Sequence, residues 1–141
     1  SETSFVLGMP DETPETIEET IKLEKYYNPD LAFFLAIAPW PYSDIYPELK
    51  PYIEEFDYSK YNLVEPIIRP VAMSREALNK ALLGAFRSFY MGKLESLDQM
   101  SSFKRNYMLD VTRLLITDSY LSKQMKGVIP PEIKKLFDRI L

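Results

Sequence analysis

The sequence predicts an α/β protein in which a parallel strand–helix–strand unit comes first and further helices follow. Two short apolar runs, residues 5 to 7 and 31 to 38, flank a segment with the apolar spacing of a one-sided helix. The joints between these three segments are short, which is typical of parallel strands joined by a right-handed crossover. From residue 74 onward, apolar residues recur at the helical period.

The first predicted strand, residues 5 to 7, is uniformly apolar and ends at Gly8, as expected for a strand buried on both faces. Thr13 then fits the N-cap of a helix over residues 14 to 27, because Pro14 suits the first helical position. Only one side of this helix needs to pack. Its apolar stripe consists of Ile17, Ile21, Leu23 and Tyr27.

Asn28-Pro29-Asp30 breaks the helix before the second strand, residues 31 to 38, which Pro39 stops. The carboxyl ends of parallel strands lie on one rim of a sheet, where α/β proteins bind ligands. Residues 8 to 13 and 39 to 43 are therefore expected to share that rim.

Residues 40 to 61 are rich in proline, tyrosine and acidic residues, and we expect a loop with short helical turns. A third extended segment is predicted over residues 63 to 68. Because Pro66 and Pro70 interrupt it, this segment belongs at a sheet edge or outside the ladder.

Three helices are predicted in the second half of the chain. The first is capped by Ser74 and runs to Tyr90, with Gly92 as its stop. The second covers residues 97 to 125, and the third covers residues 132 to 141. The apolar stripe of the second helix consists of Met100, Phe103, Tyr107, Val111, Leu114, Leu121 and Met125.

Length and composition are those of an ordinary globular protein, with 141 residues, of which 46% are apolar and 27% charged. No apolar run approaches the roughly 18 residues that a membrane span needs. No basic start of a secretory signal precedes the first apolar run. We therefore expect a cytoplasmic protein without a membrane span.

The chain contains neither cysteine nor histidine. This excludes disulfides, a thiolate-held iron–sulfur cluster, a Cys/His zinc site and histidine acid–base chemistry from this chain. Carboxylates, lysines, tyrosines and the backbone remain for catalysis. The net charge of −4 combines −9 over residues 1 to 60 with +5 over residues 61 to 141. No basic cluster interleaved with aromatics predicts a nucleic-acid partner.

The segment Gly8-Met9-Pro10-Asp11-Glu12-Thr13 lies at the predicted rim. A glycine at a strand end lets the backbone approach a ligand or take a positive φ. The following helix start supplies N–H groups without helical partners. On its own, this pattern fits an ordinary strand-to-helix turn as well.

The order of the segments resembles the last barrel strands of radical S-adenosylmethionine enzymes, especially those with an amino-terminal cobalamin-binding domain. In that family the first rim segment usually reads Gly-Leu-Pro-Gly-Glu-Thr and the second Thr-Pro-Tyr-Pro-Gly-Thr. Here Asp11 replaces the second glycine, a mild change because aspartate tolerates the left-handed region. In place of the second segment, residues 38 to 43 of this chain read Ala-Pro-Trp-Pro-Tyr-Ser.

Residues 57 to 70, 73 to 76 and 86 to 91 are similar to a narrower branch, the anaerobic magnesium-protoporphyrin monomethyl ester oxidative cyclases and their relatives. The resemblance implies that the chain is a C-terminal fragment. Its fold would be half of a parallel β/α barrel followed by a C-terminal helical extension. Residues 1 to 70 would supply barrel strands and helices, and residues 71 to 141 the extension.

The resemblance implies S-adenosylmethionine and a 4Fe-4S cluster in the full-length protein, with cobalamin as a further candidate cofactor. The family holds its cluster with a Cys-x-x-x-Cys-x-x-Cys loop and cleaves S-adenosylmethionine to a radical that abstracts hydrogen. The chain has no cysteine, so none of these cofactors is expected to be held by it alone, and it is expected to be inactive alone. The implied partner is the missing N-terminal part of the same protein. As an isolated fragment, the chain is expected to form homo-oligomers through unpaired strands.

The resemblance also implies roles for rim residues. The S-adenosylmethionine site would include Val6, Gly8, Pro10, Asp11, Ile37 and Ala38. Trp40, Tyr42 and Tyr46 are candidates for a substrate mouth, where a flat apolar ligand such as a tetrapyrrole stacks on aromatic rings. Arg69 and Arg87 are candidates for meeting a substrate carboxylate. The alternatives are loop anchoring for the aromatics and surface ion pairs for the arginines.

Three other hypotheses stay open. In the first, the chain would be a stand-alone helical interaction module that binds a partner through residues 74 to 141. In the second, it would be part of a different cobalamin-dependent radical S-adenosylmethionine methyltransferase. A carboxylate-pair hydrolase would use Asp11 or Glu12 opposite Asp44. Strand edges discriminate between fragment and module, because a self-sufficient module covers its edges with its own helices.

Overall fold

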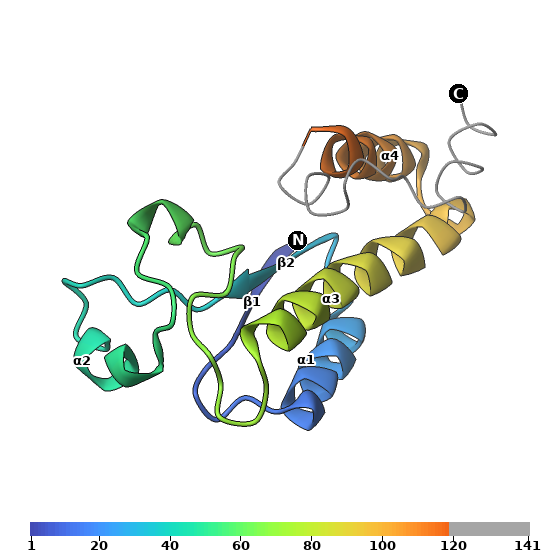
Figure 1. The fold of residues 1–141 in the computed structure, drawn as a ribbon. Coiled ribbons are helices and arrows are strands. Elements are labelled where there is room, and N and C mark those ends of the chain that lie inside the picture. Colours follow the sequence, from blue (N-terminus) through green and yellow to red (C-terminus); the bar gives the residue numbers. More distant parts are fainter. Residues whose placement is uncertain (119–141) are drawn as a thin grey trace. The chain divides into compact units, whose positions relative to one another are not determined.

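The computed structural model describes residues 1 to 118 (Figure 1). The chain divides into two compact units, Ser1–Phe89 and Tyr90–Leu141. The predicted last helix, residues 132 to 141, lies outside the described residues.

The first unit is built on a parallel sheet of two strands, β1 (Glu2–Leu7) and β2 (Leu31–Ala36). The helix α1 (Pro14–Tyr27) connects them, and the strands pair over their whole length. The predicted α/β class and the parallel strand–helix–strand unit are therefore confirmed.

The bounds of α1 agree with the prediction because local hydrogen bonds fix both ends. The Thr13 hydroxyl accepts from the Thr16 N–H at 3.2 Å, and the Thr13 N–H donates to the Thr16 hydroxyl at 3.0 Å. At the other end, Asn28 takes a left-handed φ of 45° and donates its N–H to the Glu24 carbonyl at 2.8 Å. Both devices satisfy backbone groups that a helix end leaves unpaired.

The packed stripe of α1 is narrower than predicted. Ile17 is buried, whereas Leu23 and Tyr27 are exposed. Glu24 is buried instead. A sheet of two strands offers a narrow face, so only part of the expected stripe is covered.

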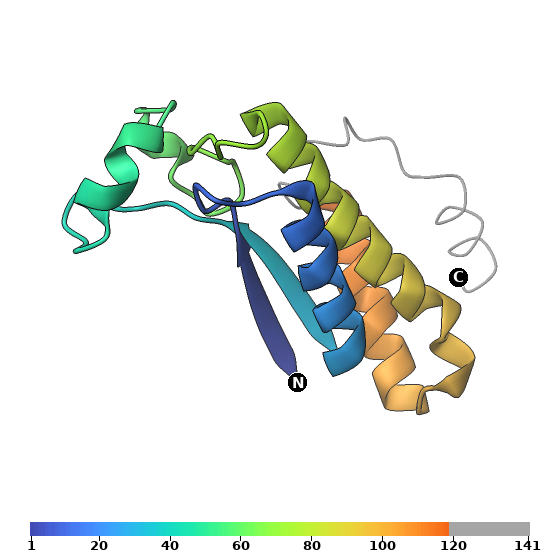
Figure 2. The ribbon, with the colours of Figure 1, turned by 90° about the horizontal axis from the view of Figure 1, so that it is seen from below.

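One face of the sheet is covered by α1 and by the first part of α3 (Arg75–Glu95), as Figure 2 shows. The Phe34 ring stacks on Phe5 with 5.4 Å between centroids and meets Phe86 of α3 edge-on at 5.3 Å. This face carries the buried strand residues Phe5, Leu7, Ala32, Phe34 and Ala36.

No helix of the first unit covers the opposite face of the sheet (Figure 2), where Leu31, Phe33 and Leu35 of β2 are half-buried. Val6, which points to this face, is 54% exposed. The prediction that the first strand is buried on both faces is therefore wrong. The reason is that helices of this unit cover one face only, whereas both faces of an all-parallel sheet are normally covered.

The middle segment is the predicted loop with short turns: α2 (Tyr46–Leu49), η1 (Lys50–Tyr52) and η2 (Tyr58–Lys60). Residues 63 to 68 do not form a strand, and their ladder contact is one antiparallel bridge between Ile53 and Ile68. A small core holds the segment, formed by Ala38, Leu49, Ile53, Tyr61, Ile67 and Ile68.

The helix α3 begins where predicted, since the Ser74 hydroxyl accepts from the Ala77 N–H at 3.1 Å. It does not stop at Gly92 but continues to Glu95. A Cβ at Gly92 would meet nothing within 4 Å. Gly92 is therefore an open helical position, where only a propensity cost of about 1 kcal/mol opposes the helix.

The predicted helix over residues 97 to 125 is interrupted. A short turn, η3 (Leu97–Gln99), precedes α4 (Ser102–Thr117). Ser101 caps α4, because its hydroxyl accepts from the Lys104 N–H at 3.4 Å. This cap starts a new helix at Ser102, although the uninterrupted apolar periodicity predicted a single helix through this position.

The predicted apolar stripe of this region is largely exposed in the described residues. Phe103, Tyr107 and Leu114 are exposed, whereas Met108 is buried. Leu121 and Met125 lie outside the described residues. The assignment of residues 1 to 70 to a barrel and residues 71 to 141 to an extension stays a prediction.

Replacing Thr13 by alanine should lower the free energy of unfolding by about 1 kcal/mol, because the first turn of α1 loses its cap. Urea unfolding followed by circular dichroism measures the change. Lys22→Ala, at an exposed position of the same helix, is the matched control and should be nearly neutral. Equal stability of the Thr13→Ala and Lys22→Ala variants would contradict the capping role.

Candidate functional site

The turn after β1 is built around Gly8, which takes a φ of +97°. The expectation of a positive φ is therefore confirmed. A Cβ at this position would lie 2.8 Å from Leu78 Cδ2 and 3.6 Å from Ile37 Cγ2. The glycine thus allows close packing within the first unit, and its Cα faces protein atoms.

Glu12 holds the turn together from inside. Its carboxylate is buried and accepts from the Gly8 N–H at 3.0 Å and from the Thr16 hydroxyl. Its own N–H donates to the Met9 carbonyl at 2.9 Å. Sequence reasoning considered Glu12 only as a hydrolase acid, although its place four residues after the glycine was the available signal. With both oxygens engaged, Glu12 is a structural carboxylate, and this argues against Glu12 as a hydrolase acid.

The other rim residues of the proposed cofactor site are also held by the backbone. The Pro10 carbonyl accepts from the Val71 N–H at 2.9 Å, and the Ile37 N–H donates to the Leu7 carbonyl at 2.8 Å. Ala38 is buried.

Val6 and Asp11 remain accessible, Val6 on the open face of the sheet and Asp11 on the turn. Asp11 is not among the residues with a positive φ, which in the described part of the chain are Gly8, Asn28 and Leu63. The expectation that Asp11 relies on tolerance of the left-handed region is therefore wrong. No positive φ is required at this position.

An aromatic row follows β2 and is formed by Trp40, Tyr42, Tyr58 and Tyr61. Trp40 and Tyr42 lie on the second rim segment, Tyr58 lies in η2, and Tyr61 comes directly after η2. Trp40 stacks on Tyr42 with 6.2 Å between centroids and 10° between planes, and lies 5.4 Å from Tyr61. Tyr58 and Tyr61 are 5.1 Å apart. Tyr42 is 84% exposed, whereas Tyr61 is buried. The row therefore has a buried base and an outward flat ring.

Tyr61 was missed as a site residue, although it lies three positions from Tyr58 in a tyrosine-rich segment. Burial raises the pKa of its phenol. Its hydroxyl has no hydrogen-bond partner among the described residues.

The remaining candidates do not join the aromatic row. Tyr46 packs on the small core, with Lys50 Nζ 5.9 Å from its ring centroid. Arg69 is exposed and pairs with Glu54 at 3.4 Å between Nη1 and Oε1. Arg87 is exposed. Tyr46 therefore anchors the loop, and Arg69 forms a surface ion pair.

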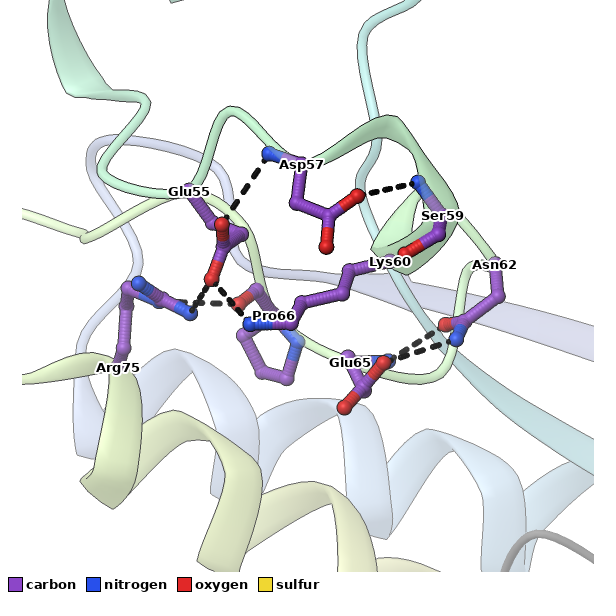
Figure 3. A network of polar contacts seen from close by, with 8 residues as sticks. All are labelled: Glu55, Asp57, Ser59, Lys60, Asn62, Glu65, Pro66 and Arg75. Atoms are coloured by element: carbon purple, nitrogen blue, oxygen red, sulfur yellow. Dashed lines mark hydrogen bonds and ion pairs between the residues drawn. The ribbon is translucent and has the colours of Figure 1, made fainter.

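A charged network fixes the segment that carries Tyr58 and Tyr61 (Figure 3). Glu55 Oε2 lies 2.7 Å from Lys60 Nζ and 3.6 Å from Arg75 Nη2. Arg75 Nε also donates to the Pro66 carbonyl at 3.0 Å. The hydrogen bond from Lys60, together with one from the Asp57 N–H, lowers the pKa of Glu55. The hydrogen bond to Glu55 raises the pKa of Lys60. The network ties this loop to the start of α3.

Leu63 takes a left-handed φ of 64°, which is uncommon for a large side chain. The neighbouring Asn62 supports it, because its side-chain oxygen accepts from the N–H groups of Val64 at 3.0 Å and Glu65 at 2.9 Å. The Leu63 carbonyl then accepts from the Ala36 N–H of β2 at 2.7 Å. Local side-chain bonds thus offset a backbone cost of about 1 kcal/mol.

Two of the curated relatives carry the same name, "Anaerobic magnesium-protoporphyrin IX monomethyl ester cyclase". The protein of Rubrivivax gelatinosus is 43% identical over 93 residues, 66% of this chain. The protein of Cereibacter sphaeroides is 39% identical over 111 residues, 77% of this chain. The predicted resemblance to the anaerobic cyclases is confirmed.

A third relative, an uncharacterized methyltransferase of Pyrococcus horikoshii, is 32% identical over 90 residues, 62% of this chain. The chain spans 17% and 18% of the length of the two cyclases and 20% of the methyltransferase. No family model and no solved structure matches the chain.

Two further findings concern residues 1 to 118. Their helices are all too short or too polar to cross a membrane. They also contain no group of three or more carboxylates placed to hold a metal ion.

Replacing Gly8 by alanine should lower the free energy of unfolding by about 2 kcal/mol, because the new Cβ meets Leu78 and an L side chain is strained at this φ. Chemical denaturation measures the loss. Gly84→Ala, in α3 with nothing within 4 Å of the new Cβ, is the control and should be neutral or stabilising. A Gly8→Ala variant as stable as Gly84→Ala would refute the requirement.

The Glu55 network predicts a pH dependence. A carboxyl group whose folded pKa is lowered stabilises the fold above its unfolded pKa, and this contribution disappears as the pH falls through the folded pKa. Glu55→Gln should therefore reduce stability at neutral pH and flatten its decline below about pH 4.5. Urea unfolding over this pH range tests it, with Glu54→Gln in the exposed pair to Arg69 as control. The same pH profile for both variants would count against the network.

Proposed function

We propose that this chain is the C-terminal portion of a radical S-adenosylmethionine iron–sulfur oxidoreductase of the anaerobic cyclase type. In that enzyme it would help to place S-adenosylmethionine and a flat apolar substrate, with a tetrapyrrole as the candidate. The observation that carries the proposal is the aromatic row directly after β2, with Tyr42 84% exposed and stacked on Trp40. The names of the two cyclase relatives support the substrate class.

The open face of the sheet supports the half-barrel part of the proposal. In a β/α barrel the helices lie outside and the other face of each strand points inward. Here α1 and the first part of α3 cover one face of β1 and β2, and the exposed Val6 lies on the other. A wall of this kind suits the interior of a larger barrel.

The rim would form one side of a site for S-adenosylmethionine, which would supply the radical chemistry when bound beside a reduced cluster. Val6 offers an exposed apolar surface that would exclude water from a flat ring. The Gly8 N–H and the Pro10 carbonyl are already engaged within the protein. We therefore assign to this chain an apolar contact with the cofactor through Val6.

The 4Fe-4S cluster does not fit this chain, because its thiolate ligands are absent from the sequence. The cluster would be held by another part of the longer polypeptide, and no residue of this chain is assigned to cobalamin. The chain alone would then bind substrate without turnover.

The substrate surface would be the outward face of Tyr42 with Trp40 beneath it. The planes of the two rings are nearly parallel, with 10° between them, which suits stacking on a flat macrocycle. Tyr61 and the Glu55 network would hold the base of the row in place. Arg69 is occupied by Glu54 and is not needed for this arrangement.

Binding can be followed through Trp40, the single tryptophan of the chain. Magnesium-protoporphyrin IX monomethyl ester should quench its fluorescence saturably, because the macrocycle would lie against the row. Tyr42→Ala should weaken binding about tenfold through loss of stacking. Tyr26→Ala is the matched control, since Tyr26 is 83% exposed on α1 and outside the row.

Two results would reject this substrate surface. One is quenching that rises linearly with the tetrapyrrole and never saturates. The other is an equal effect of Tyr42→Ala and Tyr26→Ala, since both remove one exposed tyrosine but only one belongs to the row.

A second candidate is a cobalamin-dependent radical S-adenosylmethionine methyltransferase. The relative of Pyrococcus horikoshii, named an uncharacterized methyltransferase, favours it. Incubation of the longer polypeptide with methyl-labelled S-adenosylmethionine and the tetrapyrrole separates the two: a methyltransferase transfers the label to the substrate, whereas a cyclase does not.

A further inference from the structure

The base of the aromatic row carries a polar group that the fold leaves unbonded. Tyr61 is 4% exposed, and its hydroxyl makes no hydrogen bond to any described residue. Buried hydroxyl groups in folded proteins nearly always have a partner, because taking one out of water without a new hydrogen bond costs free energy. The partner of this hydroxyl is therefore expected to come from outside the chain, as a ligand or a water molecule.

The acceptors that surround Tyr61 are engaged elsewhere. The Tyr61 N–H donates to the Tyr58 carbonyl at 3.2 Å, which fixes the place of Tyr61 directly after η2. Glu55 acts on the Tyr61 phenol through its charge. Its two oxygens, however, accept from the Asp57 N–H at 3.1 Å and from Lys60 Nζ at 2.7 Å. The network that holds this loop thus forms without the Tyr61 hydroxyl.

The Tyr61 hydroxyl is a donor at neutral pH. Burial raises the pKa of this phenol, and the negative charges that Tyr46, Tyr58 and Glu55 carry when ionised raise it further. The same surroundings oppose a ligand carboxylate beside the hydroxyl, and burial adds the cost of taking that charge out of water. A neutral carbonyl oxygen accepts the hydrogen bond without the cost of burying a charge.

Tyr61 lies at the inner end of the surface proposed for the flat ligand. Its ring centroid is 5.4 Å from that of Trp40, which stacks on the exposed Tyr42. On its other side, Tyr58 lies 5.1 Å away and is 57% exposed. Because the Tyr61 hydroxyl is enclosed, a neighbouring ring must move aside before a ligand atom reaches it. Tyr58 suits this movement, since its ring is exposed and belongs to the short turn η2.

We propose that the Tyr61 hydroxyl donates a hydrogen bond to the ester carbonyl of the substrate and so selects a neutral ester over a free carboxylate. This inference rests on the proposed function, which places a tetrapyrrole ester on the aromatic row. Tyr61 is then a specificity-determining residue. The free energy that the unbonded hydroxyl costs in the free chain is recovered when the ester binds.

Removal of this hydroxyl in Tyr61→Phe tests the proposal through binding, followed by the quenching of Trp40 fluorescence. The affinity for magnesium-protoporphyrin IX monomethyl ester should fall about tenfold, the effect of losing one buried hydrogen bond. The affinity for magnesium-protoporphyrin IX, which has a second free carboxylate in place of the ester, should not change. The urea midpoint of the ligand-free variant should be unchanged or higher, because the free chain loses no hydrogen bond.

Tyr58→Phe is the matched control. It removes the exposed phenol of the neighbouring ring in the same row and leaves the buried hydroxyl of Tyr61 in place. Its affinities for the ester and for the diacid should equal those of the unsubstituted chain.

Two results would overturn the proposal. A lower urea midpoint of Tyr61→Phe, or failure of this variant to fold, would show that the hydroxyl is already bonded in the free protein, to a buried water. An unchanged affinity for the ester, or an equal loss for the ester and the diacid, would show that the hydroxyl does not select the ester. Both results leave the proposed function standing if quenching saturates. Quenching that never saturates rejects the proposed function, and this inference with it.

Discussion

The hydrogen bond from the Gly8 N–H to the buried Glu12 carboxylate is the constraint on which the first unit depends. It closes a turn that only glycine enters without strain, and the same carboxylate accepts the Thr16 hydroxyl. The strand therefore passes directly into a helix whose N-cap is already formed. The close fit of Gly8 to Leu78 then connects this turn to α3. Polar groups that looked available for a ligand serve this joint instead.

One-sided covering of the sheet follows from that joint. With α1 and the first part of α3 on one face, β1 and β2 must alternate between buried and accessible side chains, and Val6 falls on the accessible side. The loop after β2 is organised separately, by the small core under Trp40 and by the Glu55 network. The rim thus has a rigid turn on one strand and an aromatic row on the other.

Features decided by neighbouring residues could be predicted from the sequence, and features decided by distant packing could not. Thr13, Asn28 and Ser74 mark helix ends through hydrogen bonds within a few residues. The prediction of a helix end at Gly92 is wrong, because a glycine lowers helix propensity but does not by itself stop a helix. The exposure of Phe103 and the burial of Tyr61 depend on which surfaces meet in space. For the site, the sequence predicts Trp40 and Tyr42, whereas Tyr61, whose ring lies tilted against Trp40, is identified only in the fold.

The Leu63 carbonyl also bears on the order of events during synthesis. The edge of β2 is closed by a residue 27 positions later than Ala36, so protection arrives from the same stretch of chain soon after the strand itself. No later described residue does the same for β1. Domains fold largely from the amino terminus as they leave the ribosome. The bond from the Ala36 N–H therefore forms only after residues 37 to 62 have followed β2 out of the ribosome.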